Sequence, residues 1–168
     1  FFKELIENLV GGENSPLSAD GGPAVIQVVM DGKGELKKKE SKAVKILGYT
    51  SDMAKYFSSC ICLVAPLKLG AGIKVKILEA MSAGIPVLTN EIGIEGIEAV
   101  NEKEYILCSS PDEYANSIRR LLSDQHLGEE LSLNSKRFIK KKYHMASRLD
   151  DLINIIENDL CVKENYSR

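Results

Sequence analysis

The stretch CICLVAPLKLGAGIKVKILEAMSAGIPVLTN, residues 60–90, decides the fold of this chain. It opens with the apolar run 60–65, which is typical of a strand buried on both faces. A glycine-rich turn leads into the helical segment 73–83, and a second apolar run follows at 86–89. The order strand, helix, strand predicts a parallel sheet, because parallel neighbours need a crossover that returns the chain to the starting edge.

The same alternation continues on both sides of this stretch. Outside it we expect, in chain order, a helix at 1–10, a loop at 11–23, strands at 24–30 and 43–47, helical segments at 35–42 and 52–58, a strand at 104–108, a helix that starts at Ser110 and a final amphipathic helix over 149–160. The alternation predicts an α/β fold: a Rossmann-like, doubly wound parallel sheet with helices on both faces and a helical C-terminus.

Length and composition indicate a single folded domain that does not bind nucleic acid. The 168 residues fit one domain, which we expect to span 1–160, with a polar tail over 161–168. Hydrophobic residues make up 44% and charged residues 27%, which argues against a disordered chain. Lys and Arg number 22 against 24 Asp and Glu, so we expect no nucleic-acid partner. The chain starts at Phe1 within a helical pattern, and we therefore expect it to be part of a longer protein.

The four cysteines do not form a metal-binding or disulfide framework. Cys60 and Cys62 lie two apart in the expected strand 60–65, and neither Cys108 nor Cys161 forms a Cys-x-x-Cys pair. We expect them to be small buried apolar side chains in a reducing compartment.

The glycine-rich turn has the features of an anion site. Gly70 and Gly72 allow backbone N–H groups to approach a ligand closely, and the helix start that follows favours negative charge. Lys74 and Lys76 place positive charge in a first turn that normally prefers acids. A phosphate or diphosphate would supply the missing counter-charge, and the alternative is a pair of solvated surface lysines.

Glu79 is the second unusual residue, because it stands in an otherwise apolar helical run. A buried acid is costly unless it is hydrogen-bonded, and a ribose diol would satisfy it as in other Rossmann sites. The alternative is an ordinary surface glutamate that pairs with Lys76.

The segment 66–97 resembles the C-terminal, donor-binding domain of family-4 type (group 1) glycosyltransferases of the GT-B fold. The matching residues are Gly70, Gly72, Ile73, Lys76, Ile77, Leu78, Glu79, Ala80, Met81, Gly84, Pro86 and Val87, followed by Gly93, Glu95 and Gly96. The order of elements matches over about residues 1–160, so the resemblance covers nearly the whole chain.

The resemblance implies a site for a nucleotide-diphosphate sugar. Glu79 would bind the ribose hydroxyls, and the turn would contact the diphosphate or sugar near Lys76. The implied donor-binding residues are Gly70, Ala71, Gly72, Ile73, Lys74, Lys76 and Glu79, with Gly48 and Tyr49 in the loop that contacts the base. Asp31, Gly32 and Gly34 would help to shape the crevice.

The implied activity is retaining transfer of a hexosyl-type group to a glycan, lipid or small-molecule acceptor. The acceptor would be held by an N-terminal domain outside this sequence, so the catalytic residues stay unknown and the chain alone is expected to be inactive. Many relatives carry two glutamates separated by seven residues. The second matches Glu79, but Ala71 stands at the position of the first, so that contact is lost or replaced by backbone or by Lys74. No Asp-x-Asp triplet occurs, which agrees with chemistry that needs no metal or other cofactor.

The expected location is the cytoplasm, with Lys140–Lys142 as a minor candidate for contact with lipid headgroups at a membrane surface. Two other functions stay open on the sequence. A sugar-nucleotide epimerase of the same architecture would act on the donor with no acceptor present. A non-catalytic flavodoxin-like regulatory module would carry clustered aspartates at the strand ends, where only Asp31 qualifies.

Overall fold

The computed structural model describes residues 1–10, 26–30, 44–49, 56 and 60–143. Its elements are α1 (Phe2–Val10), β1 (Ile26–Met30), β2 (Val44–Tyr49), β3 (Leu63–Ala65), α3 (Val75–Ala83), β4 (Val87–Thr89), α4 (Glu91–Ile94), β5 (Ile106–Leu107), α5 (Pro111–Ser123) and α6 (Gln125–Lys142). The segments expected at 11–23, 35–42 and 149–160, the tail 161–168, and Asp31, Gly32 and Gly34 lie outside the described residues, as does 52–58 apart from Tyr56.

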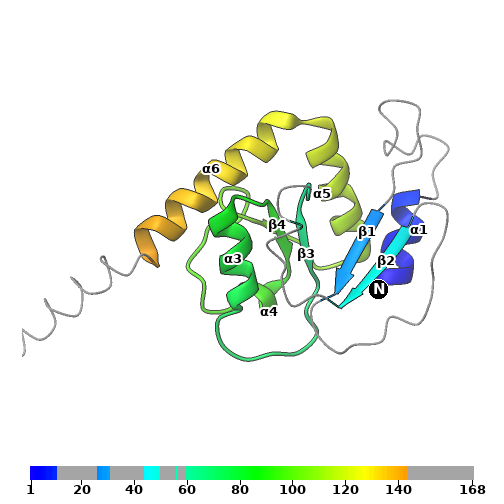
Figure 1. Ribbon diagram of the computed structural model, residues 1–168, viewed down its shortest axis with the longest axis horizontal. Coiled ribbons are helices and arrows are strands. Elements are labelled where there is room, and N and C mark those ends of the chain that lie inside the picture. Colours follow the sequence, from blue (N-terminus) through cyan, green and yellow to red (C-terminus); the bar gives the residue numbers. More distant parts are fainter. Residues whose placement is uncertain (11–25, 31–43, 50–55, 57–59, 144–168) are drawn as a thin grey trace, which may run out of the picture.

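All strand pairs are parallel, as the sequence predicts. β1 pairs with β2, and β4 lies between β3 and β5 in a second sheet. The crossovers after β3 and β4 run through α3 and α4 (Figure 1). The mixed α/β architecture with parallel strands is therefore confirmed, and within the described residues the strands form two parallel sheets.

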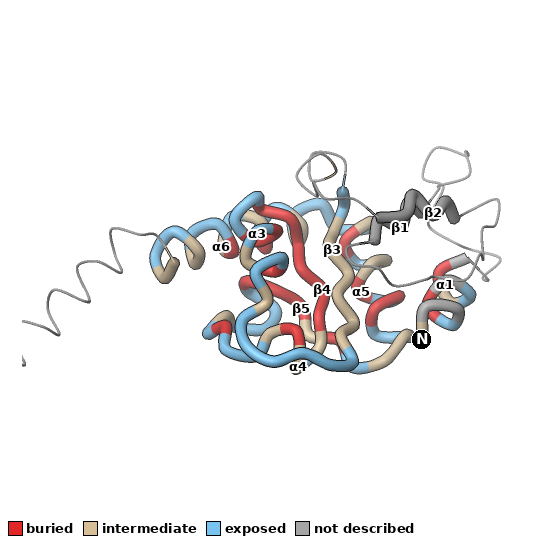
Figure 2. The backbone as a smooth tube through the Cα atoms, turned by 60° about the horizontal axis from the view of Figure 1, so that its bottom comes forward, coloured by how far each residue is buried: buried red, intermediate tan, exposed pale blue. Residues whose placement is uncertain are grey.

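Alternate residues of the central strands face two different apolar clusters. Val64, Leu88 and Ile106 pack with α1 and α5, where Leu5 and Tyr114 are buried. Leu63, Val87 and Leu107 belong to the cluster of α3 and the end of α6. Figure 2 shows the buried positions concentrated in β4 and β5 and in the helical segments that cover them. Helices thus cover both faces of the sheet, because each strand alternates side chains between the faces.

The helix α5 begins as the motif Ser110-Pro-Asp-Glu predicts. The Ser110 hydroxyl accepts a hydrogen bond from the Glu113 N–H at 3.3 Å, and Pro111 is the first helical residue. The Glu113 carboxylate reaches back to the N–H of Ser109 at 2.7 Å. Two donors at the start of the helix are therefore satisfied by side chains.

The helix α3 ends at Gly84, again as predicted. Gly84 has φ 81°, and its N–H is bonded to the Ala80 and Met81 carbonyls. The helix α6 packs along α3 (Figure 1), and the buried Ser135 hydroxyl donates to the Met81 carbonyl at 3.3 Å. These contacts fix the orientation of α3 on the sheet.

Two strands are shorter than expected. The strand expected over 60–65 begins at Leu63, whose N–H bonds the Pro86 carbonyl at 2.9 Å, and the preceding Cys60 is exposed. The expectation that Cys60 is buried is therefore wrong. The strand expected over 104–108 is reduced to β5, because the chain before it turns at Glu102, which has φ 60°.

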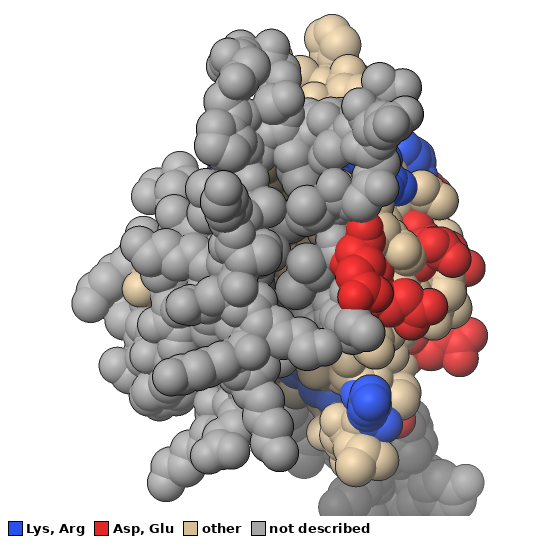
Figure 3. Space-filling model, turned by 90° about the vertical axis from the view of Figure 1, so that its right-hand side faces the viewer, with Lys and Arg blue, Asp and Glu red and all other residues tan. Residues whose placement is uncertain are grey.

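Acidic side chains of the described residues form a group near α1. Figure 3 shows Asp and Glu side chains gathered on the side that carries α1, which contributes the exposed Glu4 and Glu7. None of the helices that the structure describes is long and apolar enough to cross a membrane.

Candidate functional site

The candidate site lies at the carboxyl ends of β3 and β4. Two loops meet there: residues 66–74, which connect β3 to α3, and residues 90–97, which contain α4. Open parallel sheets bind ligands outside the carboxyl ends of their strands. We call these two segments the glycine turn and the α4 loop.

Side chains from the end of β4 join the two loops. The Thr89 hydroxyl donates to the Ala65 carbonyl at 2.9 Å, and the Asn90 amide donates to the Leu67 carbonyl at 2.6 Å. The Asn90 side-chain oxygen also accepts from the Gly93 N–H at 3.1 Å and so caps α4. The two loops are therefore held in one arrangement.

Gly93 allows the α4 loop to lie close to the sheet. A Cβ at this position would lie 1.9 Å from the Thr89 hydroxyl oxygen and 3.2 Å from the Ile77 Cδ1. No side chain fits in that space. The glycine thus places the α4 loop against the start of α3.

The glycine turn is open to solvent. Gly70 and Gly72 have φ of 144° and 72°, a region that L side chains rarely adopt. A Cβ at Gly72 would meet nothing within 4 Å. Ala71 and Ile73 are also exposed. A ligand could therefore approach the backbone of this turn.

Lys74 ties the glycine turn to the α4 loop. Its ammonium donates to the Gly72 carbonyl, lies 3.5 Å from the Gly70 carbonyl and pairs with the Glu95 carboxylate at 3.5 Å. The Lys74 side chain is only 13% exposed, against 58% for Glu95. The counter-charge expected for Lys74 from a ligand is thus partly supplied by the protein itself.

The other expected residues on α3 lie on its solvent side. Lys76 and Glu79 are exposed, whereas Ile77, Ala80 and Met81 are buried against the sheet. Glu79 therefore does not need a ligand to compensate for burial. The helix begins after Lys74 with no side-chain cap at its N-terminus. This arrangement leaves the helix start available to an external anion.

Gly48 and Tyr49 are the last two residues of β2, where they pair with Val29 and Met30. The sequence placed them in a loop after the strand, and this boundary is wrong by two residues. Both residues still lie at the carboxyl end of a parallel strand, which is where a segment that contacts the base of a nucleotide is expected.

Two of the described cysteines, Cys62 and Cys108, do not supply reactive thiols. Burial raises the pKa of Cys62 to about 12, with a smaller contribution from Cys60 and Cys108. Burial also raises the pKa of Cys108, although a hydrogen bond with Ser117 opposes the shift. Both thiols stay protonated near neutral pH, so they are not nucleophiles.

A shallow hollow lies at the opposite, amino ends of the strands. Ile61 and Pro86 line it together with Leu121, Leu122 and Glu129 of the two following helices. Gln125 and Ser132 complete its polar lining, and none of the expected donor-binding residues lines it.

Sequence reasoning missed the residues that assemble the site. Thr89 and Asn90 join the loops, and Glu95 was noted only as part of the family motif. The Asn90–Glu91 pair carries a helix-start signal that could have revealed α4, because Asn is a preferred N-cap and acids favour the first turn.

Comparisons with known proteins identify the family and the fold of this chain. The family model described as "Glycosyl transferases group 1" matches residues 15–124. A protein of Xenopus tropicalis, "Glycosyltransferase 1 domain-containing protein 1", is 28% identical over 90 residues, which are 54% of this chain and 26% of that protein. The chain therefore spans about a quarter of the length of this curated relative.

Solved structures share the fold. TarM of S. aureus has a TM-score of 0.69 at 22% identity and covers 91% of this chain, which matches 31% of TarM. Anabaena Alr3699/HepE in complex with UDP has a TM-score of 0.60 at 18% identity, with 69% of this chain and 32% of that chain covered. The C-terminal domain of LpcC from Francisella tularensis has a TM-score of 0.56 at 20% identity, and the match covers 62% of this chain and 55% of that chain. These similarities confirm the predicted GT-B-like architecture, and the family match shows that this chain belongs to the group 1 glycosyltransferases.

Proposed function

We propose that this chain binds a nucleotide-diphosphate sugar and supports retaining transfer of its hexosyl-type group to an acceptor. The observation that carries the proposal is the meeting of the glycine turn, the uncapped start of α3 and the α4 loop at the strand ends. Membership in the group 1 glycosyltransferases and the UDP bound to the structural neighbour Alr3699/HepE support it.

The diphosphate would lie against the glycine turn and the start of α3. Backbone N–H groups near Gly70 and Gly72 and the positive end of the helix dipole favour an anion there. Lys76, exposed in the first turn of α3, would add a charge-assisted contact. Lys74 would contribute less charge, because Glu95 partly neutralises it, but its bonds to the turn would hold the donor-binding backbone in place. Stabilisation of the leaving diphosphate is the contribution of this part to the reaction.

The nucleoside would extend across the exposed side of α3. Glu79 would accept hydrogen bonds from the ribose hydroxyls, because a carboxylate has only acceptor capacity and a diol offers two donors. Gly48 and Tyr49, at the end of β2, would lie near the base. Ala71 and Ile73 would contribute backbone contacts to the sugar.

The acceptor, whether a glycan, a lipid or a small molecule, would be held by an N-terminal domain beyond this sequence. The match covers only 26% of the Xenopus tropicalis protein and 31% of TarM, which supports a division of the reaction between this chain and a further domain. We expect the chain alone to bind the donor but not to transfer sugar, to need no metal, and to act in the cytoplasm, with peripheral contact to membrane lipids through Lys140–Lys142 as a further option.

Titration calorimetry of the 168-residue chain with UDP, GDP, ADP and CDP tests the proposal. We expect one of the four to bind more tightly than the others, with the same affinity in excess EDTA. If a folded chain binds none of them, the proposal is wrong. Conversion of a nucleotide sugar into its epimer with no acceptor present would instead identify an epimerase.

A further inference from the structure

In the part of the chain that the structure describes, the carboxylate of Glu95 is paired with Lys74 of the glycine turn. It comes from the α4 loop, and its Oε2 lies 3.5 Å from the Lys74 ammonium. The turn itself offers no acidic side chain, because its residues from 70 to 73 are Gly, Ala, Gly and Ile. A ligand at the turn would therefore find the Glu95 carboxylate beside it.

Lys74 pairs with this carboxylate and also reduces the electrostatic repulsion between the carboxylate and an anionic ligand. Its ammonium is bound to two carbonyl oxygens of the turn, so the lysine has little freedom to leave. The pair with Glu95 is neutral in sum, and its carboxylate repels a neighbouring diphosphate less than an isolated one would.

The position of Glu95 is also fixed by its backbone. A Cβ at Gly96 would lie 3.2 Å from Ile73 Cγ1, so the α4 loop lies close to the glycine turn beside Lys74. Glu95 itself is 58% exposed. Its side chain is thus open to solvent beside the two loops.

We propose that Glu95 accepts hydrogen bonds from hydroxyl groups of the donor sugar, with Lys74 as the positioning residue that holds the carboxylate. A carboxylate accepts only, and sugar hydroxyls are donors that can reach it without a change of charge. This inference rests on the proposed function, because it assumes that the diphosphate lies at the glycine turn. It predicts that Glu95 distinguishes a nucleotide sugar from the bare nucleotide.

The test compares the affinities for UDP and UDP-glucose, and for GDP and GDP-mannose, in the parent chain and in Glu95→Gln. The substitution keeps the size of the side chain but removes its charge. We expect the variant to bind the bare nucleotide within twofold of the parent and the nucleotide sugar about 10-fold more weakly. Glu98→Gln is the matched control, because Glu98 lies in the following segment and pairs with Lys142 at 2.6 Å. It should leave both affinities unchanged.

Lys74→Met and Lys74→Arg test the positioning role. We expect Lys74→Met to reproduce the loss of sugar affinity and Lys74→Arg to restore part of it. An unchanged ratio of the two affinities in Glu95→Gln would overturn the inference while the proposed function stands. Tighter binding of the bare nucleotide by Glu95→Gln would also overturn it and identify Glu95 as a competing counter-anion. Failure of the folded parent to bind UDP, GDP, ADP or CDP, with or without an attached sugar, would overturn both.

Discussion

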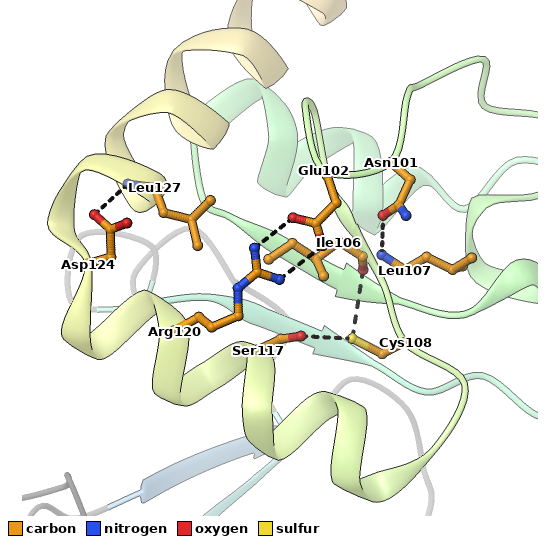
Figure 4. Close-up of polar contacts among 9 residues, drawn as sticks. All are labelled: Asn101, Glu102, Ile106, Leu107, Cys108, Ser117, Arg120, Asp124 and Leu127. Carbon is orange, nitrogen blue, oxygen red and sulfur yellow. Dashed lines mark hydrogen bonds and ion pairs between the residues drawn. The ribbon is translucent and has the colours of Figure 1, made fainter.

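The guanidinium of Arg120 forms two hydrogen bonds with the carboxylate of Glu102, at 3.0 and 2.8 Å (Figure 4). The pair joins α5 to the turn that precedes β5. Glu102 has φ 60°, so the turn carries a conformation that non-glycine residues rarely adopt. The hydrogen bond from Arg120 holds the pKa of Glu102 below its usual value, and the charge of Arg120 adds to this effect.

Glu102→Gln should therefore reduce stability in a pH-dependent way. Because the folded state lowers the pKa of Glu102, the pair stabilises the fold above the unfolded value of 4.5, and this contribution disappears as pH falls through the lower folded value. Both side chains are about half exposed, so we expect a loss of about 0.5–1 kcal/mol at pH 7. Urea unfolding of parent and variant between pH 3 and pH 7 measures it.

The difference between the two proteins should shrink towards zero at the acid end. Glu130→Gln, a change at an exposed position of α6, should stay within about 0.5 kcal/mol of the parent at pH 7. A difference for Glu102→Gln that stays constant over this pH range would contradict the role of the charged pair.

Gly93→Ala should destabilise the fold. The added Cβ would lie 1.9 Å from the Thr89 hydroxyl oxygen, so the α4 loop must move or Thr89 must lose its hydrogen bond to Ala65. Overpacking of this kind costs about 1–3 kcal/mol. Gly128→Ala in α6 is the control, because its Cβ would meet only Leu121 at 4.0 Å and alanine favours a helix by about 1 kcal/mol. Urea unfolding should therefore show opposite signs, and equal losses would refute the packing argument.

The elements with strong local signals were predictable from the sequence. Ser110, Pro111 and Glu113 start a helix by local hydrogen bonds, and Gly84 ends one by its left-handed conformation, so neither needs information from distant residues. The parallel arrangement of the strands was also predictable, because strands that alternate with helices along the chain pair in parallel.

Strand ends and site assembly were not predictable, since they depend on contacts between distant segments. Residues 60–62 are apolar but precede the point at which β4 can pair, so the strand starts at Leu63. The bond from Asn90 to the Leu67 carbonyl and the pair of Lys74 with Glu95 span 23 and 21 residues. Neither spacing follows a helical or strand period, so no pattern in the sequence reveals them.

Gly72→Ala should weaken binding of nucleoside diphosphate. The new Cβ would point into open space, so it meets no protein atom and would block only a ligand that approaches the turn. The φ of 72° adds a strain of about 1–2 kcal/mol to the folded chain. Calorimetric titration should show a loss of affinity of 10-fold or more, together with a modest loss of stability.

Gly84→Ala separates strain from binding. Its φ is 81° and its Cβ would lie 2.3 Å from Lys136 Cε, but Gly84 is at the far end of α3 from the turn. We expect it to lose more stability than Gly72→Ala and to keep the parental affinity. If Gly72→Ala folds and binds as the parent does, the diphosphate does not lie at this turn.

Glu79→Ala should weaken nucleotide binding while the fold keeps its stability. Glu79 is exposed on α3, and alanine is the best helix former, so we expect a stability change within about 0.5 kcal/mol. Loss of a charged acceptor from the ribose diol should cost about 1.5–3 kcal/mol of binding free energy, or roughly 10- to 150-fold in affinity. Glu79→Gln keeps the size but not the charge, so its affinity should lie between those of the parent and the alanine variant.

The 2′-deoxy nucleotide tests the same contact from the side of the ligand. The parent should bind it more weakly than the ribonucleotide, because one of the two hydroxyl donors to the Glu79 carboxylate is missing. The Glu79→Ala variant lacks the carboxylate that would accept a hydrogen bond from the 2′-hydroxyl. It should therefore bind both nucleotides equally well. Equal discrimination by the two proteins would show that the ribose is recognised elsewhere, and Glu79 would then be an ordinary surface residue of α3.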